Sequence, residues 1–163
     1  MKSRLIWVKS MVIAAIYTAL TVLLGMLSYG ELQFRLSDAM IILPLLPRLG
    51  IEAIIGLTVG GFLGNITSPF QPWDLIFGPI TNFFASLVVY LVGRKVRSNL
   101  TVKHAIGSIT ASVIIAVMVG FFELHLVYEL PLITVAYVLI SELIVIGVVG
   151  YMVLRSLERY FVK

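Results

Sequence analysis

Acidic residues lie within stretches of this sequence that are otherwise apolar enough for a membrane. The clearest is Glu142, about eleven residues into the run 132–154, which places its carboxyl roughly 16 Å deep at about 1.5 Å per helical residue. A charged group near the middle of a bilayer costs about 2.5–3.5 kcal/mol on insertion scales, so Glu142 needs a partner or a task. A hydrogen bond to another helix would meet this need, and so would contact with a ligand or an ion.

Three other polar residues, Gln33, Arg35 and Asp38, stand close enough in the sequence to converge near the start of the apolar stretch 37–47. Arg35 can simply pair with Asp38 or Glu31, and an exposed ion pair contributes little to stability. The same side chains can instead contact a ligand. Both interpretations remain open.

Asn65, Asp74 and Asn82 form another polar group around the loop TSPFQPWD. Asn65 ends one apolar stretch, Asp74 begins the next, and Asn82 follows two turns later, so all three can face the outer half of one cavity. Asp74 can also serve only as a helix N-cap, and Asn82 can bond to a neighbouring helix. Trp73 beside them is typical of an interfacial aromatic belt, unless it stacks on a flat ligand.

Catalytic and metal chemistry find little support in the sequence. No nucleophile stands beside a base in a recognisable pattern, so we expect no catalytic residue and no enzyme. Glu123, His125 and Glu129 are expected to be solvated in or near an external loop, with at most one ligand contact among them. A Glu and a His two residues apart are only a weak metal signal. We therefore predict neither a metal nor a cofactor.

The elements that hold these residues must lie in a membrane. Of the 163 residues, 60% are hydrophobic and only 12% are charged, and the mean hydropathy of +1.08 excludes a soluble globule with a polar shell. The net charge of +4 and the pI near 9.5 do not indicate nucleic acid, because the basic residues follow membrane topology. The absence of Cys excludes disulfides and thiolate sites.

Six apolar stretches predict an all-α integral membrane protein of the cell membrane, a compact bundle of six transmembrane helices that forms one domain over residues 1–163. The first stretch resembles a signal peptide, but its length and its lack of a small-x-small exit favour a retained helix. The second is short for a span, so we expect that it begins before Ser37 or that irregular backbone buried in protein completes this crossing. The stretches are 11–29, 37–47, 50–66, 75–93, 104–122 and 132–154.

Basic residues predict the orientation, since cytoplasmic loops collect Lys and Arg. They form three clusters, and if all three are cytoplasmic the stretch 37–66 crosses twice or not at all. Two crossings give six helices with both termini in the cytoplasm, whereas a re-entrant hairpin would leave four spans. The clusters are Lys2, Arg4 and Lys9; Arg94, Lys95, Arg97 and Lys103; and Arg155, Arg159 and Lys163.

Small residues at four-residue spacing mark two close-packing faces. One is formed by Gly56, Gly60 and Gly64, the other by Ala15 and Ala19 in the first helix. Either face can pack inside the bundle or dock a separate membrane protein. The sequence also lacks a G-x-x-x-x-G-K-[ST] phosphate loop, so any energy for transport must come from a partner or an ion gradient.

Several motifs resemble a known family, the substrate-binding S components of energy-coupling-factor (ECF) vitamin transporters, and in particular the queuosine-precursor branch. The likeness covers nearly the whole chain. It rests on QFRLSDA (33–39) with the LP-rich turn that follows, GGFLGN (60–65), WDLIFGPITN (73–82) and SELIVIGVVG (141–150). In such a family, Glu would be as ordinary as Asp at position 38.

The resemblance implies a six-helix subunit that captures a scarce nutrient from outside. It also implies partners, namely a transmembrane coupling protein and a pair of ATPases, which would explain the missing phosphate loop. Ala15 and Ala19 match the docking pattern of the first helix in such subunits. Two rival interpretations remain: an S component for another vitamin or nucleobase-like nutrient, and a stand-alone ion-coupled carrier in which Glu142 is the ion or proton site.

The branch further implies a 7-deazaguanine ligand such as preQ0, preQ1 or queuine. The guanine edge of such a ligand carries neighbouring N–H donors and a carbonyl acceptor, so its site should combine a carboxylate, a donor and an aromatic plane. The candidates are Glu142, Asp38 or Asp74 for the carboxylate, Asn65, Asn82, Gln33 or Arg35 for the donor, and Trp73 or Phe34 for the plane.

Overall fold

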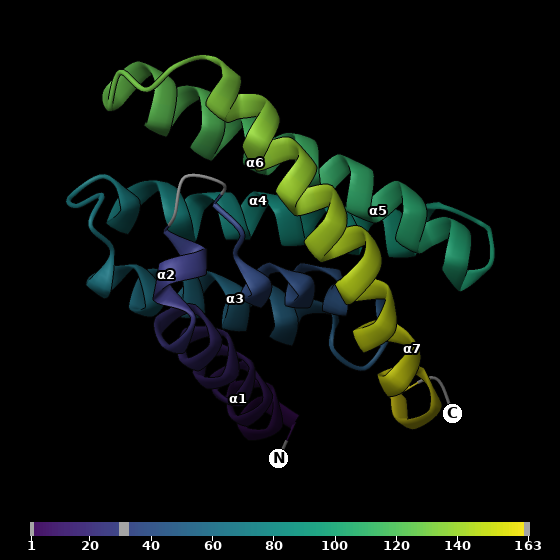
Figure 1. Cartoon of the computed structure of the whole chain (residues 1–163). Coiled ribbons are helices and arrows are strands. Elements are labelled where there is room, and N and C mark those ends of the chain that lie inside the picture. The colour runs from purple at the N-terminus through teal and green to yellow at the C-terminus, as the bar shows by residue number, and fades with distance from the viewer. Residues whose placement is uncertain (1, 30–32, 162–163) are drawn as a thin grey trace.

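The computed structural model describes residues 2–29 and 33–161, and every regular element in this part of the chain is a helix (Figure 1). Five helices are long and apolar enough to cross a membrane, which confirms the predicted all-helical membrane protein. These spans are α1 (Lys2–Leu23), α3 (Gly50–Gly64) with η2 (Asn65–Thr67), α4 (Asp74–Lys95), α5 (Leu100–Ile115) with η3 (Ala116–Val127), and α6 (Ile133–Ile144) with η4 (Val145–Val149) and α7 (Gly150–Phe161).

The remaining predicted crossing, the stretch 37–47, corresponds to η1 (Leu36–Leu45). This 3₁₀ helix follows the short α2 (Gly25–Ser28). At about 2.0 Å per residue its ten residues cover roughly 20 Å, less than the hydrocarbon core of about 30 Å. Residues 37–46 are all buried, because η1 is mostly apolar and packs against α3, α4 and α7. The count of six crossings and the re-entrant alternative therefore stay predictions.

The glycine stripe of α3 packs inside the bundle, against α1. A Cβ added to Gly56 would lie 2.6 Å from the carbonyl oxygen of Ser10, and one added to Gly60 would lie 2.9 Å from Cβ of Tyr17. Such short approaches require glycine, since any side chain would push the two backbones apart. Gly64 also faces α1, near Thr21. Of the two roles that the sequence left open for this stripe, the structure selects internal packing.

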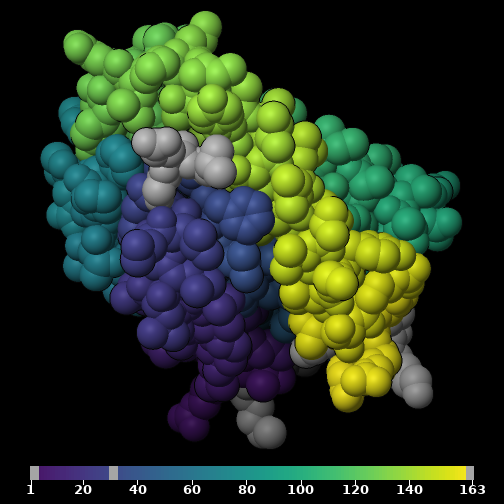
Figure 2. Space-filling model, in the orientation of Figure 1, coloured from purple at the N-terminus to yellow at the C-terminus, as the bar shows by residue number. Residues whose placement is uncertain are grey.

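The outer surface of the bundle is apolar, as a lipid-facing surface must be. Both α1 and α7 lie at the surface in Figure 2, and Met11 on α1 and Met152 on α7 are 69% and 65% exposed. Ala15 and Ala19 lie on this exposed side of α1, away from α3. The second small-residue face is thus free of contacts within the described bundle, and its use for docking stays a prediction.

Basic residues from all three clusters gather at one end of the bundle. Lys9 Nζ donates to the carbonyl of Arg48 at 2.8 Å, and Arg48 donates to the carbonyl of Tyr160 at 3.4 Å. Arg155 on α7 donates to the hydroxyl of Thr101, which lies at the start of α5 after the second basic cluster. The start of α1 and the end of α7 lie toward the same, lower part of Figure 1. This arrangement fits the positive-inside pattern, and the assignment of that end to the cytoplasm stays a prediction.

Candidate carboxyl site

A buried guanidinium, that of Arg35, is placed by irregular backbone before η1. Gln33 has a φ of 47°, in the left-handed region, and its carbonyl accepts a hydrogen bond from the Arg35 N–H at 3.0 Å. Arg35 is only 5% exposed, and its guanidinium carbon lies 5.5 Å from the ring centroid of Tyr29. Strained backbone of this kind clusters at functional sites, where the surrounding structure holds it in place.

Asp74, the first residue of α4, faces this guanidinium. Its Oδ1 lies 4.0 Å from the Arg35 side chain, and both residues are buried. Asn65 Nδ2 donates to the backbone carbonyl of Asp74 at 2.9 Å and lies 3.4 Å from its Oδ1. The other carboxyl oxygen of Asp74 has no hydrogen-bond partner among the described residues. Asp74 therefore does more than begin its helix.

Asp38 on η1 and Glu142 on α6 form a pair of buried carboxyls. The two side chains interact with each other, and the Tyr17 hydroxyl donates to Asp38 Oδ1. Asp38 is 3% exposed and Glu142 is 1% exposed, yet Glu142 Oε2 finds no donor among the described residues. Two carboxyl groups can hydrogen-bond only if one carries a proton, so this pair requires a proton or a donor from elsewhere.

Glu123 on η3 forms a second carboxyl pair with Asp74. Its side chain is completely buried, and within the described chain neither of its oxygens has a hydrogen-bond partner. A buried carboxylate without donors is costly, and such a group in a native fold calls for an explanation. Glu123 is the acid of this site with the greatest unmet capacity to accept hydrogen bonds.

Arg35 interacts electrostatically with all four acids. We refer to Arg35, Asp38, Asp74, Glu123 and Glu142 together as the carboxyl cluster. In the described part of the chain, no other Lys or Arg lies within ion-pair distance of these acids. The same residues form no group with metal-site spacing. The cluster thus has a surplus of hydrogen-bond acceptors and of negative charge, which suits a ligand rich in N–H donors.

The two asparagines mainly join α3 to α4. Asn82 Nδ2 donates to the carbonyl of Leu57 at 3.0 Å, and Asn82 also contacts the Tyr17 hydroxyl. Asn65 bonds to Asp74, as described above, but its own Oδ1 has no partner among the described residues. Asn82 therefore helps to hold the Tyr17 hydroxyl in place, whereas the Oδ1 atom of Asn65 can still accept a hydrogen bond.

Both glutamates of the cluster lie at π-helical turns. Glu123 belongs to η3, where the Tyr128 N–H bonds back five residues to the Glu123 carbonyl at 3.1 Å. Glu142 comes three residues before η4. A π turn rotates the side chains around it relative to an α-helix, and such turns are frequent at functional sites. This is the local reason why Glu123 faces the bundle.

Two aromatic residues, Phe70 and Tyr128, lie near the Asp74–Glu123 pair. The Tyr128 hydroxyl donates to the carbonyl of Phe70, and the two rings stand edge to face with centroids 5.2 Å apart. Burial, with nearby Glu123 and Asp74, raises the pKa of the Tyr128 phenol, so this hydroxyl remains a donor. The two rings join the loop before α4 to the turn after η3.

A family model described as the QueT transporter matches residues 7–159, which is nearly the whole chain. The chain belongs to the QueT transporter family. No curated protein and no solved structure matches the chain. Membership confirms the family that the motifs predicted and identifies a membrane transporter.

In this QueT-family protein, most of the predicted site residues come together and two stand apart. The carboxyl cluster unites residues from four elements, with Gln33 buried in the turn beside it. Trp73 is 43% exposed and lies next to Phe77, as an interfacial aromatic would, and Phe34 is half-buried. Contact of any of these residues with a ligand stays a prediction. The predicted residues that converge are Arg35, Asp38, Asp74 and Glu142, with Asn65 and Asn82 behind them.

The expectation that Glu123 is solvated was wrong. It assumed that the fifth helix ends near residue 122, whereas the helical path of the QueT-family protein continues through η3 to Val127. The signal was available in the sequence, because the residues around Glu123 in GFFELHLV are mostly apolar. A charged residue inside such a run should have been treated as Glu142 was.

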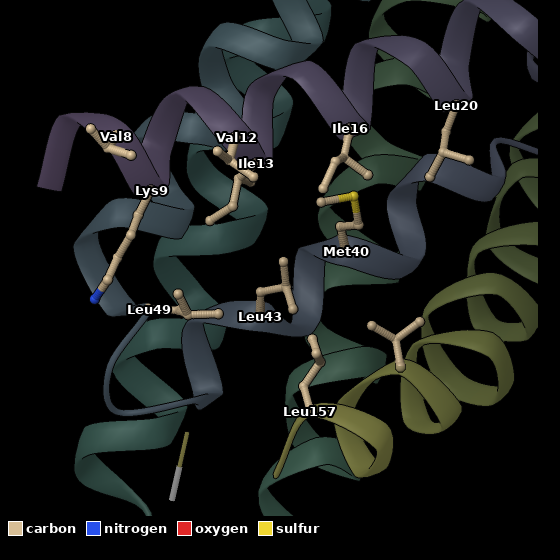
Figure 3. A pocket seen from close by; sticks show the side chains of 11 residues that line it. Val8, Lys9, Val12, Ile13, Ile16, Leu20, Met40, Leu43, Leu49 and Leu157 are labelled. Atoms are coloured by element: carbon tan, nitrogen blue, oxygen red, sulfur yellow. The ribbon is translucent and has the colours of Figure 1, made fainter. Parts of the chain in front are cut away.

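One cavity of the QueT-family protein lies away from the carboxyl cluster. A groove of about 510 Å³ opens between α1, η1 and α7. Figure 3 shows Ile16 and Leu20 of α1 facing Met40 and Leu43 of η1 across it. Apart from Lys9 at one end, its lining is apolar and offers no hydrogen bonds to a polar nutrient. We do not assign nutrient binding to this groove.

Proposed function

We propose that this protein is the substrate-binding S component of an ECF-type importer and captures a queuosine precursor, a 7-deazaguanine such as preQ0, preQ1 or queuine, from outside the cell. The observation that carries the proposal is Glu123. In a member of the QueT family, a fully buried carboxylate with two unpartnered oxygens lies beside Asp74 and Arg35. A guanine edge supplies the donors that such a group lacks.

Each part of the guanine edge has a counterpart in the carboxyl cluster. The ring N–H and the neighbouring exocyclic amine are parallel donors, and Glu123 has both oxygens free to accept them in a bidentate bond. The ring carbonyl is an acceptor and suits the guanidinium of Arg35, which lies against Asp74. Glu142 and Asp38 remain for the substituent that distinguishes the precursors.

The best candidates for aromatic stacking on the ligand are the rings of Phe70 and Tyr128. The rings of Phe70 and Tyr128 contact each other, and Tyr128 lies near Glu123 and Asp74, so we expect a flat ligand bound at these acids to stack on one of the rings. Phe34, next to Arg35, is a second candidate. Trp73 would have to turn inward from its exposed position to take part.

Partner docking is assigned to the exposed face of α1. Ala15 and Ala19 lie one turn apart on that face, so a helix of a coupling protein can approach the α1 backbone closely there. We propose a transmembrane coupling protein with a pair of ATPases as the partner. The absence of a phosphate loop from the sequence supports an external energy source.

A calorimetric titration of the purified protein tests the proposal. The panel should hold several 7-deazaguanines, ordinary guanine and unrelated vitamins. The proposal expects binding of a 7-deazaguanine in preference to the rest, and sustained uptake into vesicles only with the coupling protein and ATPases. Binding of another nutrient alone would point to a different S component. Uptake by the protein alone, driven by a pH or sodium gradient, would favour an ion-coupled carrier that uses Glu142.

A further inference from the structure

The two carboxyl pairs, Asp74–Glu123 and Asp38–Glu142, differ in how their negative charge is balanced. Asp74 lies 4.0 Å from Arg35, so the Asp74–Glu123 pair has a cation at its side. No Lys, Arg or His of the described chain lies within ion-pair distance of Asp38 or Glu142. The hydroxyl of Tyr17 donates to Asp38, and Glu142 Oε2 has no hydrogen-bond partner among the described residues.

Apart from Arg35, which also serves Asp74 and Glu123, the described surroundings of the Asp38–Glu142 pair supply no positive charge to balance it. The groups that face the pair are Tyr17 from α1, Arg35 from the segment before η1, and Asp74 from α4. Titratable groups on the other packed helices are engaged elsewhere. Glu52 of α3 pairs with Lys9, His104 of α5 bonds the carbonyl of Ile146, and Glu158 of α7 pairs with Arg155.

Two buried carboxyls in contact, with one hydroxyl donor between them, are stable only with a positive charge added. A proton shared by the pair supplies it when the site is empty, since a carboxyl can donate to a carboxylate. An ammonium group can take the place of that proton. It brings one positive charge and three N–H donors, one of which can bond the unpartnered Oε2 of Glu142.

We propose that the Asp38–Glu142 pair is an ammonium site, so that the protein selects a precursor carrying a protonated amine and releases a proton from the pair when this cation binds. The inference rests on the proposed function, because the ring of the ligand would occupy the Glu123 end of the cluster. Among the 7-deazaguanines, the aminomethyl form carries such an amine, and its charge at neutral pH is like that of lysine. The cyano form is neutral and has no donor at this position.

The chemistry of the exchange is balanced. The cation enters, one proton leaves the carboxyl pair for solvent, and the net charge of the site is unchanged. Proton release links the affinity for the cation to pH, and the affinity rises with pH by up to about tenfold per unit while one proton is released per ligand. The affinity for the neutral cyano form should change little over the same range.

Calorimetric titration with the aminomethyl and cyano forms provides the test. The aminomethyl form should bind the natural protein about 10- to 100-fold more tightly at neutral pH, the range expected for hydrogen bonds to a charged group. Repeating the titration in buffers of different ionisation enthalpy should show release of about one proton per aminomethyl ligand. Glu142→Gln should abolish both the preference and the proton release.

Each outcome decides between the two proposals. Equal affinity for the two forms, or a preference that persists in Glu142→Gln, would overturn the ammonium site and leave the proposed function intact. Failure of both forms to bind the natural protein would overturn the proposed function and this inference with it. If Glu142→Gln does not fold, Asp38→Asn serves as the second variant, and the proton count of the natural protein still decides the matter.

Discussion

The side chain of Asn65 fills the space that a side chain at Gly78 would occupy, because Asn65 Nδ2 lies only 1.8 Å from the ideal Cβ position of that glycine. Asn82 stands in the same relation to Gly61, at 2.6 Å. Each asparagine follows one of these glycines by four residues, and each amide donates to a carbonyl one turn before the other glycine. The G-x-x-x-N pattern therefore occurs once on α3 and once on α4, and the two copies lock the helices together.

This contact predicts that Gly78→Ala will disturb both the fold and the site. The added methyl must displace the Asn65 amide, which then releases the start of α4 and with it Asp74. Overpacking of this kind costs about 1–3 kcal/mol, and we expect a lower Tm in detergent together with weaker ligand binding. The control is Gly147→Ala, because a Cβ at Gly147 meets no atom within 4 Å. Equal Tm values for the two variants would show that the packing of Asn65 against Gly78 does not stabilise the bundle.

Substitution of Glu123 by Gln should weaken ligand binding without unfolding the bundle. The amide keeps the shape of the side chain but replaces one acceptor by a donor, so the bidentate bond to the guanine edge is lost. We expect a loss of affinity of about 10- to 100-fold in a calorimetric titration. Glu158→Gln provides the control, since Glu158 is partly exposed and pairs with Arg155 on α7. If Glu123→Gln binds the ligand as tightly as the natural protein does, Glu123 is not part of the site.

Arg35 should be essential for stability as well as for binding. Its removal leaves four buried acids without their cation, and breaking one side of a buried charge arrangement costs about 3–5 kcal/mol. Arg35→Gln should therefore unfold at a clearly lower temperature. The loss should be smaller in acid, because carboxyls that take up protons no longer need the guanidinium. The exposed Arg155→Gln is the matched control, and a similar Tm for both would show that the cluster is neutral without Arg35.

The sequence predicted the helical membrane fold and the family, because both depend on features that composition and short motifs record directly. Asp38 and Glu142 could be picked out singly as acids in apolar runs, but their contact joins residues about a hundred positions apart and needs the packing of η1 against the last span. Glu123 was misplaced because its burial depends on a π-helical continuation of the fifth helix. Hydrophobic periodicity does not reveal π turns, since it is read at 3.6 residues per turn.

The exposed face of α1 predicts a variant that separates coupling from binding. Ala15→Trp adds a large ring where a coupling protein would approach. The side chain of Ala15 is exposed on the outside of the bundle, away from the carboxyl cluster. Uptake into vesicles that contain the partner proteins should fall severalfold, while ligand affinity in detergent stays unchanged. Ala105→Trp, at an exposed position on α5, should leave both properties intact. Full uptake by Ala15→Trp would move the docking surface elsewhere.

The position of the turn between η1 and α3 decides the number of crossings, and single cysteines can locate it because the natural chain has none. Pro47 is exposed in this turn, which the bonds from Lys9 to Arg48 tie to the basic end of the bundle. We expect Pro47→Cys to react with an impermeant maleimide only from the cytoplasmic side, as Ser98→Cys should. Pro131→Cys, in the turn between η3 and α6, should react only from outside. Labelling of Pro47→Cys in intact cells would mean that η1 and α3 form a re-entrant hairpin, and the carboxyl cluster would then have to receive its ligand through a four-span bundle.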